Sequence, residues 1–242
     1  MRRARKIDEG EKKIRFVSAT RYSTEDFFSK APLGRSLQLY RAFPLEFRVE
    51  LRLFSENSAG LPLVYNTAID EAKQDPALLI FVHDDVFLND FYWSSHLAAA
   101  LADFDLVGLA GNKRRVPRQP SWMYLDENFT RDHGDNLSGV VGHGSGFPDL
   151  SQLSAYGPPG QEVKLLDGVL LAIQSATLLH HDLRFDTQFD FHFYDLDFCR
   201  QAELRKLRMG TFAVSMIHAS VGQLGGGSWL AAYQRYLRKY DE

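Results

Sequence analysis

Short apolar runs alternate along the chain with segments whose apolar residues recur at helical spacing. Runs of this length are typical of strands that are buried on both faces. We expect strands at residues 14–19, 49–54, 78–83, 105–110 and 211–218, and one or two more within 163–173. We expect helices at residues 23–30, 61–74, 91–102, 195–210 and 228–240. The alternation of strand and helix predicts an α/β fold with a mainly parallel central sheet and helices on both faces.

Local signals set the ends of several predicted helices. Ser23 and Asp26 stand three residues apart, as in a capping box at a helix start. Pro62 suits a first helical turn, and Ser228 is the expected N-cap of the C-terminal helix. Gly210 follows a basic stretch, and we expect it to stop the helix that precedes it.

Residues 111–160 break this pattern. They hold eight of the 18 glycines and five of the nine prolines. A segment this long without regular structure is usually functional or mobile, so we expect a long loop region here. We interpret residues 1–242 as a single domain, with a basic, solvated tail at residues 1–12.

Composition and charge narrow the classes of function. The chain of 242 residues has a net charge of -3, which argues against a nucleic-acid-binding protein. Cys199 is the single cysteine, so no intrachain disulfide can form, as is usual in a reducing cytoplasm. No apolar run approaches the ~20 residues that a membrane span needs. We therefore expect a cytoplasmic protein with no transmembrane segment, and we leave open its attachment to a membrane surface.

Polar side chains gather where the predicted strands end. In open α/β sheets, ligands bind beyond the carboxyl ends of the strands. The residues at these ends are Ser18 and Thr20, then Ser55, Glu56 and Asn57, then His83, Asp84 and Asp85, and finally Asn112 and His218. Five strands that end in this way predict one crevice with carboxylates and an imidazole. Such a donor set suits a divalent cation that bridges to a phosphate.

Several signatures of nucleotide-binding and hydrolytic enzymes are missing from the sequence. No glycine-rich turn follows the first predicted strand, and neither G-x-x-x-x-G-K-[ST] nor H-E-x-x-H occurs. The segment GHGSG at residues 142–146 lacks the spacing of a nucleophile elbow.

Four segments of the sequence, in order, resemble a known family. They are SAGLPLVYNTAIDEA (58–72), FVHDDVFL (81–88), LLDGVLLAI (165–173) followed by LRFDTQFDFHFYDLDFCRQA (183–202), and MIHASVGQ (216–223). The set resembles inverting glycosyltransferases of the GT-A fold, and among them the branch named for the StrF domain of streptomycin biosynthesis. Each segment alone is weakly specific, whereas four in order with sensible spacing are fairly specific.

The resemblance implies a reaction and a role for each residue. A sugar would pass from a nucleoside-diphosphate donor, UDP above all, to an acceptor hydroxyl with inversion at the anomeric carbon. Asp85 and His218 would hold Mn²⁺ or Mg²⁺, and Asp195 would take the proton of the acceptor hydroxyl. The residues expected to bind the donor are Ser18, Thr20, Glu56, Asn66, Asp84, Asp167 and Gly168.

The resemblance leaves some points open. His83 stands where the family motif has its first Asp, so a register shift of one residue would exchange the roles of Asp84 and Asp85. Gly168 lies within a predicted strand, where a glycine marks a close approach, and the resemblance makes the donor sugar the approaching group. The acceptor, which could be a glycan, a lipid-linked glycan or a small molecule, would be chosen by residues 111–160.

Simpler explanations stand beside these assignments. His218 could be a core histidine, and Asp195 and Asp197 could merely complement a helix dipole. The basic run at residues 113–118 predicts a solvated face. A non-catalytic protein that binds sugar nucleotides or carbohydrates on the same fold is the main alternative, and a metal-dependent phosphohydrolase is another. Intact Asp85, Asp195 and His218 favour the transferase, and no further Asp/His cluster supports a second metal ion.

Overall fold

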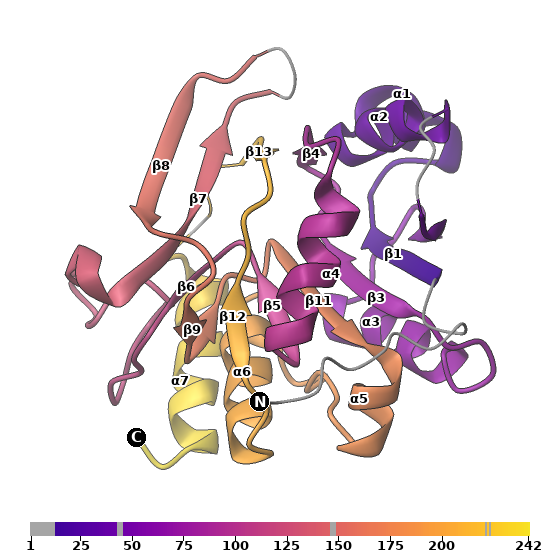
Figure 1. The fold of residues 1–242 in the computed structure, drawn as a ribbon. Helices are drawn as coiled ribbons and strands as arrows, with labels where there is room; N and C mark the ends of the chain where they lie inside the picture. The colour runs from indigo at the N-terminus through magenta and orange to yellow at the C-terminus, as the bar shows by residue number, and fades with distance from the viewer. Residues whose placement is uncertain (1–12, 43–45, 146–148, 221, 223) are drawn as a thin grey trace, which may run out of the picture.

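A computed structural model of the protein describes residues 13–42, 46–145, 149–220, 222 and 224–242 (Figure 1). The predicted basic tail at residues 1–12 lies outside the described residues. Among the helices that are described, none combines the length and the apolar character needed to cross a bilayer.

A mixed sheet of seven strands forms the larger layer of the described part of the chain. Its strands follow the order β2 (Arg48–Phe54), β1 (Lys13–Ala19), β3 (Leu78–Val82), β11 (Leu170–Gln174), β5 (Leu106–Gly108), β12 (Met209–Thr211) and β9 (Glu162–Val163). Of these strands, β1, β3 and β11 are almost entirely buried, which agrees with their continuous apolar sequence.

A smaller sheet continues from the larger one. Its order is β10 (Leu165–Leu166), β6 (Ala110–Asn112), β7 (Leu137–His143), β13 (Met216–His218) and β4 (Val86–Leu88), and β8 (Gln152–Gly157) pairs with β7. The chain passes between the sheets over very short links. Leu109 separates β5 from β6, Lys164 separates β9 from β10, and residues 83–85 lead from β3 into β4.

The helices that the structure describes pack on these sheets (Figure 1). They are α1 (Thr24–Lys30), α2 (Pro32–Leu39), α3 (Leu61–Glu71), α4 (Trp93–Asp103), α5 (Ser175–His180), α6 (Tyr194–Leu204) and α7 (Gly227–Lys239), with short 3₁₀ turns η2 (Tyr40–Ala42) and η3 (Gly134–Asn136).

Helices cover both faces of the larger sheet, as predicted. Phe16 of β1 is paired in register with Ile80 of β3, so the two side chains share a face, while Phe81 points to the opposite face. Trp93 of α4 packs on Phe16 with ring centroids 5.2 Å apart. Tyr65 of α3 packs on Phe81 at 4.9 Å. The two helices therefore lie on opposite faces of the sheet.

Aromatic side chains join α6 and α7 to the core. The ring centroid of Phe185 lies 5.0 Å from that of Phe81 and 4.0 Å from that of Phe198 in α6. Because Phe81 points to the face that α3 covers, α6 lies on the same face. Phe193 stacks on Tyr233 of α7, and both rings are buried. The apolar stripe of the C-terminal helix is thus core packing.

The sheet is less parallel than the sequence predicted. Strand β1 runs parallel to β2 and β3, and β12 runs parallel to β5, but β11 is antiparallel to both of its neighbours. Residues 167–169 lead from β10 of the smaller sheet into β11 of the larger one. Strand β11 enters beside the carboxyl end of β3, with Leu170 opposite Val82, and runs the other way.

Two predicted segments have a different structure. Residues 111–160 contain the β7–β8 hairpin, which projects beside β13 in Figure 1, rather than one long loop. Its glycines lie where backbones meet: a Cβ on Gly139 would stand 2.1 Å from the carbonyl oxygen of Leu109, and one on Gly157 would stand 2.4 Å from that of Leu137. Residues 211–218, predicted as one strand, divide between β12 and β13 of different sheets.

The predicted helix ends are partly confirmed. The Ser23 hydroxyl accepts the backbone N–H of Asp26 at 3.1 Å, and Pro62 lies in the first turn of α3. Helix α7 begins one residue before Ser228. Helix α6 ends at Leu204, and Gly210 lies in β12 instead of stopping it. A glycine is required there because a Cβ would collide with the Phe104 ring.

We expect the α6 core contact to be a large contributor to stability. Phe198 is fully buried, and replacing a buried Phe with Ala typically costs about 3–5 kcal/mol. Urea unfolding followed by circular dichroism should show a loss of this size for Phe198→Ala. Leu204→Ala on the same helix is the control, because this side chain is 70% exposed and its loss should change stability by less than about 0.5 kcal/mol. Equal effects of the two variants would contradict the packing described here.

Candidate active site

The turn of residues 83–85 carries two adjacent carboxylates that face different partners. Asp84 Oδ2 accepts a hydrogen bond from the Thr20 hydroxyl at 2.5 Å. Asp85 Oδ1 lies 3.3 Å from His218 Nε2 and 4.0 Å from His83 Nδ1. Burial raises the pKa of Asp84. Burial alone would do the same to Asp85, but His218 and His83 together hold the pKa of Asp85 below its usual value. The repulsion that adjacent acids would suffer is thus relieved separately for each.

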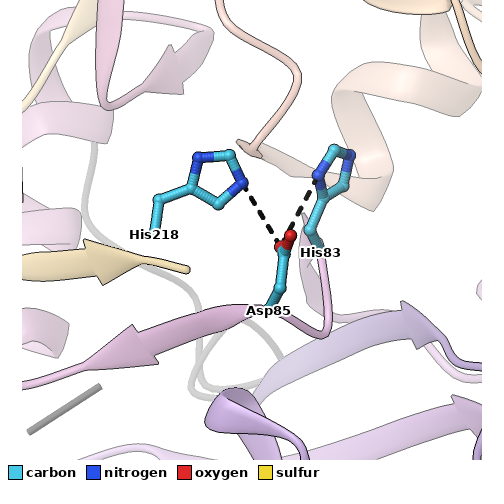
Figure 2. Close-up of side chains that lie close together, drawn as sticks. All are labelled: His83, Asp85 and His218. Atoms are coloured by element: carbon cyan, nitrogen blue, oxygen red, sulfur yellow. Dashed lines mark ion pairs between the residues drawn. The ribbon is translucent and has the colours of Figure 1, made fainter. Parts of the chain in front are cut away.

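Three side chains form a compact cluster with the donor set of a metal site (Figure 2). One ligand atom each from His83, Asp85 and His218 lie within 4.8 Å of one another. Asp85 Oδ1 and His218 Nε2 are buried and face each other at 3.3 Å without hydrogen-bond geometry, and neither has another polar partner among the described residues. Two ligands of one ion that each bind at about 2.1 Å are about 3 Å apart. The residues therefore fit a divalent cation, which would supply the missing partner of both buried atoms.

Strand pairing places the cluster at the junction of the two sheets. Strand β13 is antiparallel to β4, with His218 opposite Val86. The backbone N–H of Ala219 donates to the carbonyl oxygen of Asp85 at 2.9 Å, which extends this pairing by one step. The predicted neighbours Asp85 and His218 are thus brought together by backbone hydrogen bonds. His83 joins them across the turn formed by Asp84 and Asp85, which leaves its Nδ1 4.0 Å from Asp85 Oδ1.

Asp195 lies in the first turn of α6, close to residues 167–168. Its carboxylate accepts the backbone N–H groups of Gly168 at 3.1 Å and Leu196 at 2.9 Å. Burial, assisted by the nearby Asp167 carboxylate, raises the pKa of Asp195 to about 7. A carboxyl with this pKa is suited to accept a proton near neutral pH.

The close approach that Gly168 was expected to allow is made by side chains of α6. A Cβ at Gly168 would stand 2.5 Å from the Tyr194 hydroxyl oxygen and 2.9 Å from Asp195 Cβ. The glycine therefore makes room for the start of α6, where we had expected a donor sugar. Asp167 accepts the N–H of Val169 at 3.1 Å and lines the same cavity as Asp195.

Two cavities lie near the turn of residues 83–85: one is lined by Asp84, and the other by His218 of the cluster. The first, with a volume of about 450 Å³, is lined by residues that include Thr20, Arg21, Asn57 and Asp84. The second, of about 200 Å³, is lined by residues that include Trp122, His143, Tyr156, Asp167, Asp195 and His218. Phe191 lines both cavities, and its ring stacks on His83 with centroids 5.8 Å apart.

Three other residues of the predicted donor set are placed differently. Ser18 is fully buried in β1, and its hydroxyl has no partner within the described residues. Glu56 is exposed in a left-handed turn (φ 50°), and its neighbour Asn57 lines the first cavity. The side-chain amide of Asn66 bonds the backbone carbonyl of Phe185 at 2.8 Å and its N–H at 3.1 Å, so Asn66 anchors that loop to α3.

Asp197 and the basic run at residues 113–118, for which structural roles were considered, make contacts within the chain. Asp197 is fully buried and contacts Lys239 at 2.5 Å and the Tyr240 hydroxyl at 2.6 Å, so it ties α6 to α7. The basic run at residues 113–118 was predicted as a solvated face, and Arg114 and Arg118 are indeed exposed, while all three of its arginines also form ion pairs within the chain. These pairs are Arg114 with Asp132, Arg115 with Glu203, and Arg118 with Glu127.

Sequence analysis placed His83 in the crevice without a metal-binding role, and it missed other residues of the site. His83 had a usable signal, because it stands two residues before Asp85 in an H-x-D arrangement. His143 had none, since it depends on the parallel pairing of β7 with β13, which sets it beside His218. Phe191 and Tyr194 lay inside a recognised segment, but only the fold shows that their rings contact His83.

A family model described as "Glycosyltransferase like family" matches residues 42–222. The chain belongs to this family. The prediction of a transferase is thereby confirmed at the level of the family. No curated protein matches the chain in sequence.

Two solved structures illustrate what the chain is similar to. GalNAc-T7 with UDP, GalNAc and Mn²⁺ is similar with a TM-score of 0.55 and 11% identity, over 93% of this chain and 48% of that one. TarS 1–349 of S. aureus has a TM-score of 0.45 and 15% identity, over 86% of this chain and 60% of that one. The chain thus spans well under two thirds of either relative. The predicted GT-A fold is confirmed.

The elevated pKa of Asp195 can be measured directly. We expect the ¹³Cγ signal of Asp195 to titrate near pH 7, about three units above an ordinary Asp. Asp167→Asn should lower this pKa, because it removes a nearby negative charge, but burial should keep it above the usual value. Asp103→Asn, at the exposed end of α4, is the control and should leave it unchanged. Titration near pH 4 in the native chain would show that Asp195 is not the buried acid described here.

Proposed function

We propose that the protein is a metal-dependent, inverting glycosyltransferase of the StrF-like branch that moves a sugar from a nucleoside-diphosphate donor to an acceptor hydroxyl. One observation carries the proposal: a single cavity is lined by the Asp195 carboxyl and by His218 of the metal-type cluster. The reaction needs both groups side by side, because the acceptor must lose a proton while the leaving diphosphate gains negative charge.

The first cavity is the proposed donor site. A divalent cation at the cluster would neutralise the charge that develops on the leaving diphosphate. Asp84 and Asn57 line this cavity and would bind hydroxyl groups of the ribose or the sugar. Thr20 holds the Asp84 carboxylate in place from β1. The GalNAc-T7 structure contains UDP, which supports UDP as the first nucleotide to test.

Asp195 is the proposed general base. Both of its oxygens accept backbone N–H groups, which fix the carboxylate in one orientation at the start of α6. As the acceptor oxygen attacks the anomeric carbon, its proton passes to Asp195 and the bond to the diphosphate oxygen breaks. The transition state resembles that of glycoside hydrolysis, with oxocarbenium character. A single displacement of this kind inverts the anomeric carbon and needs no covalent nucleophile.

The second cavity is the proposed acceptor site. It is lined by aromatic side chains that include Trp122, Tyr156 and Phe191, and by no Lys or Arg among its described residues. Its acidic groups are Asp167 and Asp195, and its three histidines include His218 of the cluster, where the positive charge would be engaged by the donor diphosphate. An acceptor that carried phosphate near its reacting hydroxyl would be repelled there. An uncharged hydroxyl compound such as a glycan therefore suits the cavity best.

The ligands favour Mn²⁺ over Mg²⁺. Mg²⁺ prefers oxygen ligands and retains its water, whereas imidazole suits the transition metals better. We expect Mn²⁺ with UDP at about 100 times its Kd to stabilise the protein by about 2.7 kcal/mol, or several degrees in Tm, and Mg²⁺ to do less. His218→Ala should abolish the shift, and His180→Ala, exposed at the end of α5, should preserve it. Equal shifts with Mn²⁺ and with EDTA would refute the metal dependence.

Replacement of Asp195 separates catalysis from binding. Asp195→Asn keeps the shape of the side chain but cannot take the acceptor's proton, so transfer should fall by about 10²–10⁴-fold. The affinity for UDP and Mn²⁺, measured by calorimetry, should stay within a few-fold of the native value. Asp103→Asn again serves as the control and should keep full activity.

Other outcomes point to other functions. A native protein that binds UDP and Mn²⁺ but transfers no sugar to any of a panel of neutral and phosphorylated acceptors would be a binding protein on this fold. Release of the sugar to water alone would indicate a hydrolase. Loss of donor binding in Asp195→Asn, with turnover intact at saturation, would show that Asp195 binds substrate and is not the base.

A further inference from the structure

The Tyr194 hydroxyl lies between a backbone carbonyl oxygen and an imidazole nitrogen, and this arrangement determines the direction of both hydrogen bonds. It is 2.8 Å from the carbonyl oxygen of Gly168 and 2.9 Å from His83 Nε2. A carbonyl oxygen can only accept a hydrogen bond, and a tyrosine hydroxyl has a single proton to donate. Tyr194 therefore donates to Gly168, and the bond to His83 requires a proton on His83 Nε2.

The position of this proton decides which nitrogen of His83 can bind a metal ion. In the neutral ring, a proton on Nε2 leaves the lone pair on Nδ1. Nδ1 is the nitrogen that faces Asp85, at 4.0 Å from Oδ1, and Figure 2 shows the ring turned with this atom toward the carboxylate. Metal ligands bind through an unprotonated nitrogen. The tyrosine thus keeps the ligand nitrogen free of a proton.

The fold holds Tyr194 firmly in this position. The residue is 3% exposed, and its ring centroid lies 6.0 Å from that of Tyr65 and 5.9 Å from that of Phe185. Phe193, the residue before it, has a left-handed conformation (φ 66°) that begins α6. Gly168 completes the arrangement, since any side chain there would displace the tyrosine hydroxyl.

We propose that Tyr194 is a positioning residue for the metal site, which fixes the tautomer and the ring orientation of His83 so that Nδ1 is ready to bind the cation. The inference rests on the metal dependence proposed above. Outer-shell hydrogen bonds of this kind typically change metal affinity by about 10–100-fold. Tyr194 and the proposed base Asp195 are neighbours at the start of α6, so one helical turn would set up both halves of the site.

Two measurements test the role of Tyr194 without using transfer activity. The first is the long-range ¹H–¹⁵N spectrum of the metal-free native protein, which should show His83 with Nε2 protonated and Nδ1 unprotonated. The second is Mn²⁺ affinity, measured by the paramagnetic resonance of free Mn²⁺ in the absence of donor. Tyr194→Phe should weaken Mn²⁺ binding by about 10–100-fold and give His83 a mixture of tautomers.

A matched control removes a similar hydrogen bond elsewhere. The Tyr233 hydroxyl donates to the carbonyl oxygen of Arg118 at 2.6 Å, so Tyr233→Phe also deletes one buried bond from tyrosine to a backbone carbonyl. This variant should bind Mn²⁺ as the native protein does. A role of Tyr194 in stability alone would lower the Tm of both variants and leave both Mn²⁺ affinities unchanged.

The other possible results either support or overturn the proposed role of Tyr194. A native His83 with its proton on Nδ1, or native Mn²⁺ affinity in Tyr194→Phe, would overturn it. If Tyr194→Phe fails to fold, the native tautomer alone still gives the answer. A native protein that binds Mn²⁺ with the expected tautomer but never transfers sugar would refute the proposed function and leave the role of Tyr194 standing. A native protein that binds no Mn²⁺ would refute both.

Discussion

The antiparallel pairing of β4 with β13 is the interaction on which the site depends. It spans the junction of the two sheets and joins segments that are far apart in the chain, with His218 opposite Val86 and Ala219 bonded to Asp85. Because backbone hydrogen bonds set the register, a slip of one residue would turn His218 away from the carboxylate. The larger sheet supplies the rigid base for this pairing, and its last residues before the turn, in β3, are buried on both faces.

The site also shows how the fold accommodates acidic groups that it partly buries. Asp84 and Asp85 are adjacent, yet one is bonded to a hydroxyl and the other lies among imidazoles. Asp195 receives only backbone N–H groups and stands near Asp167, so its negative charge is poorly compensated. A binding site for a neutral sugar would not require such an arrangement, whereas proton transfer benefits from it.

The sequence predicted the elements with strong local signals and the residues that carry the site's charge. The runs in β1 and β3 were found because buried strands are continuously apolar. Asp85 and His218 were associated through the family resemblance, and the structure places them 3.3 Å apart. The β7–β8 hairpin was missed, since glycines that allow backbones to meet look like loop signals. The role of Asn66 and the contact of Tyr194 with His83 depend on long-range packing, which no local pattern records.

The shared ring of Phe191 has a consequence for how specificity can change in this protein. One side chain forms part of the wall of both cavities and stacks on His83 beside the cluster. A smaller residue at this position would enlarge both spaces together and would remove the ring that stacks on His83. Evolution of the protein toward a new substrate through this position is therefore constrained: the two cavities cannot diverge independently there, and selection on one is also selection on the other.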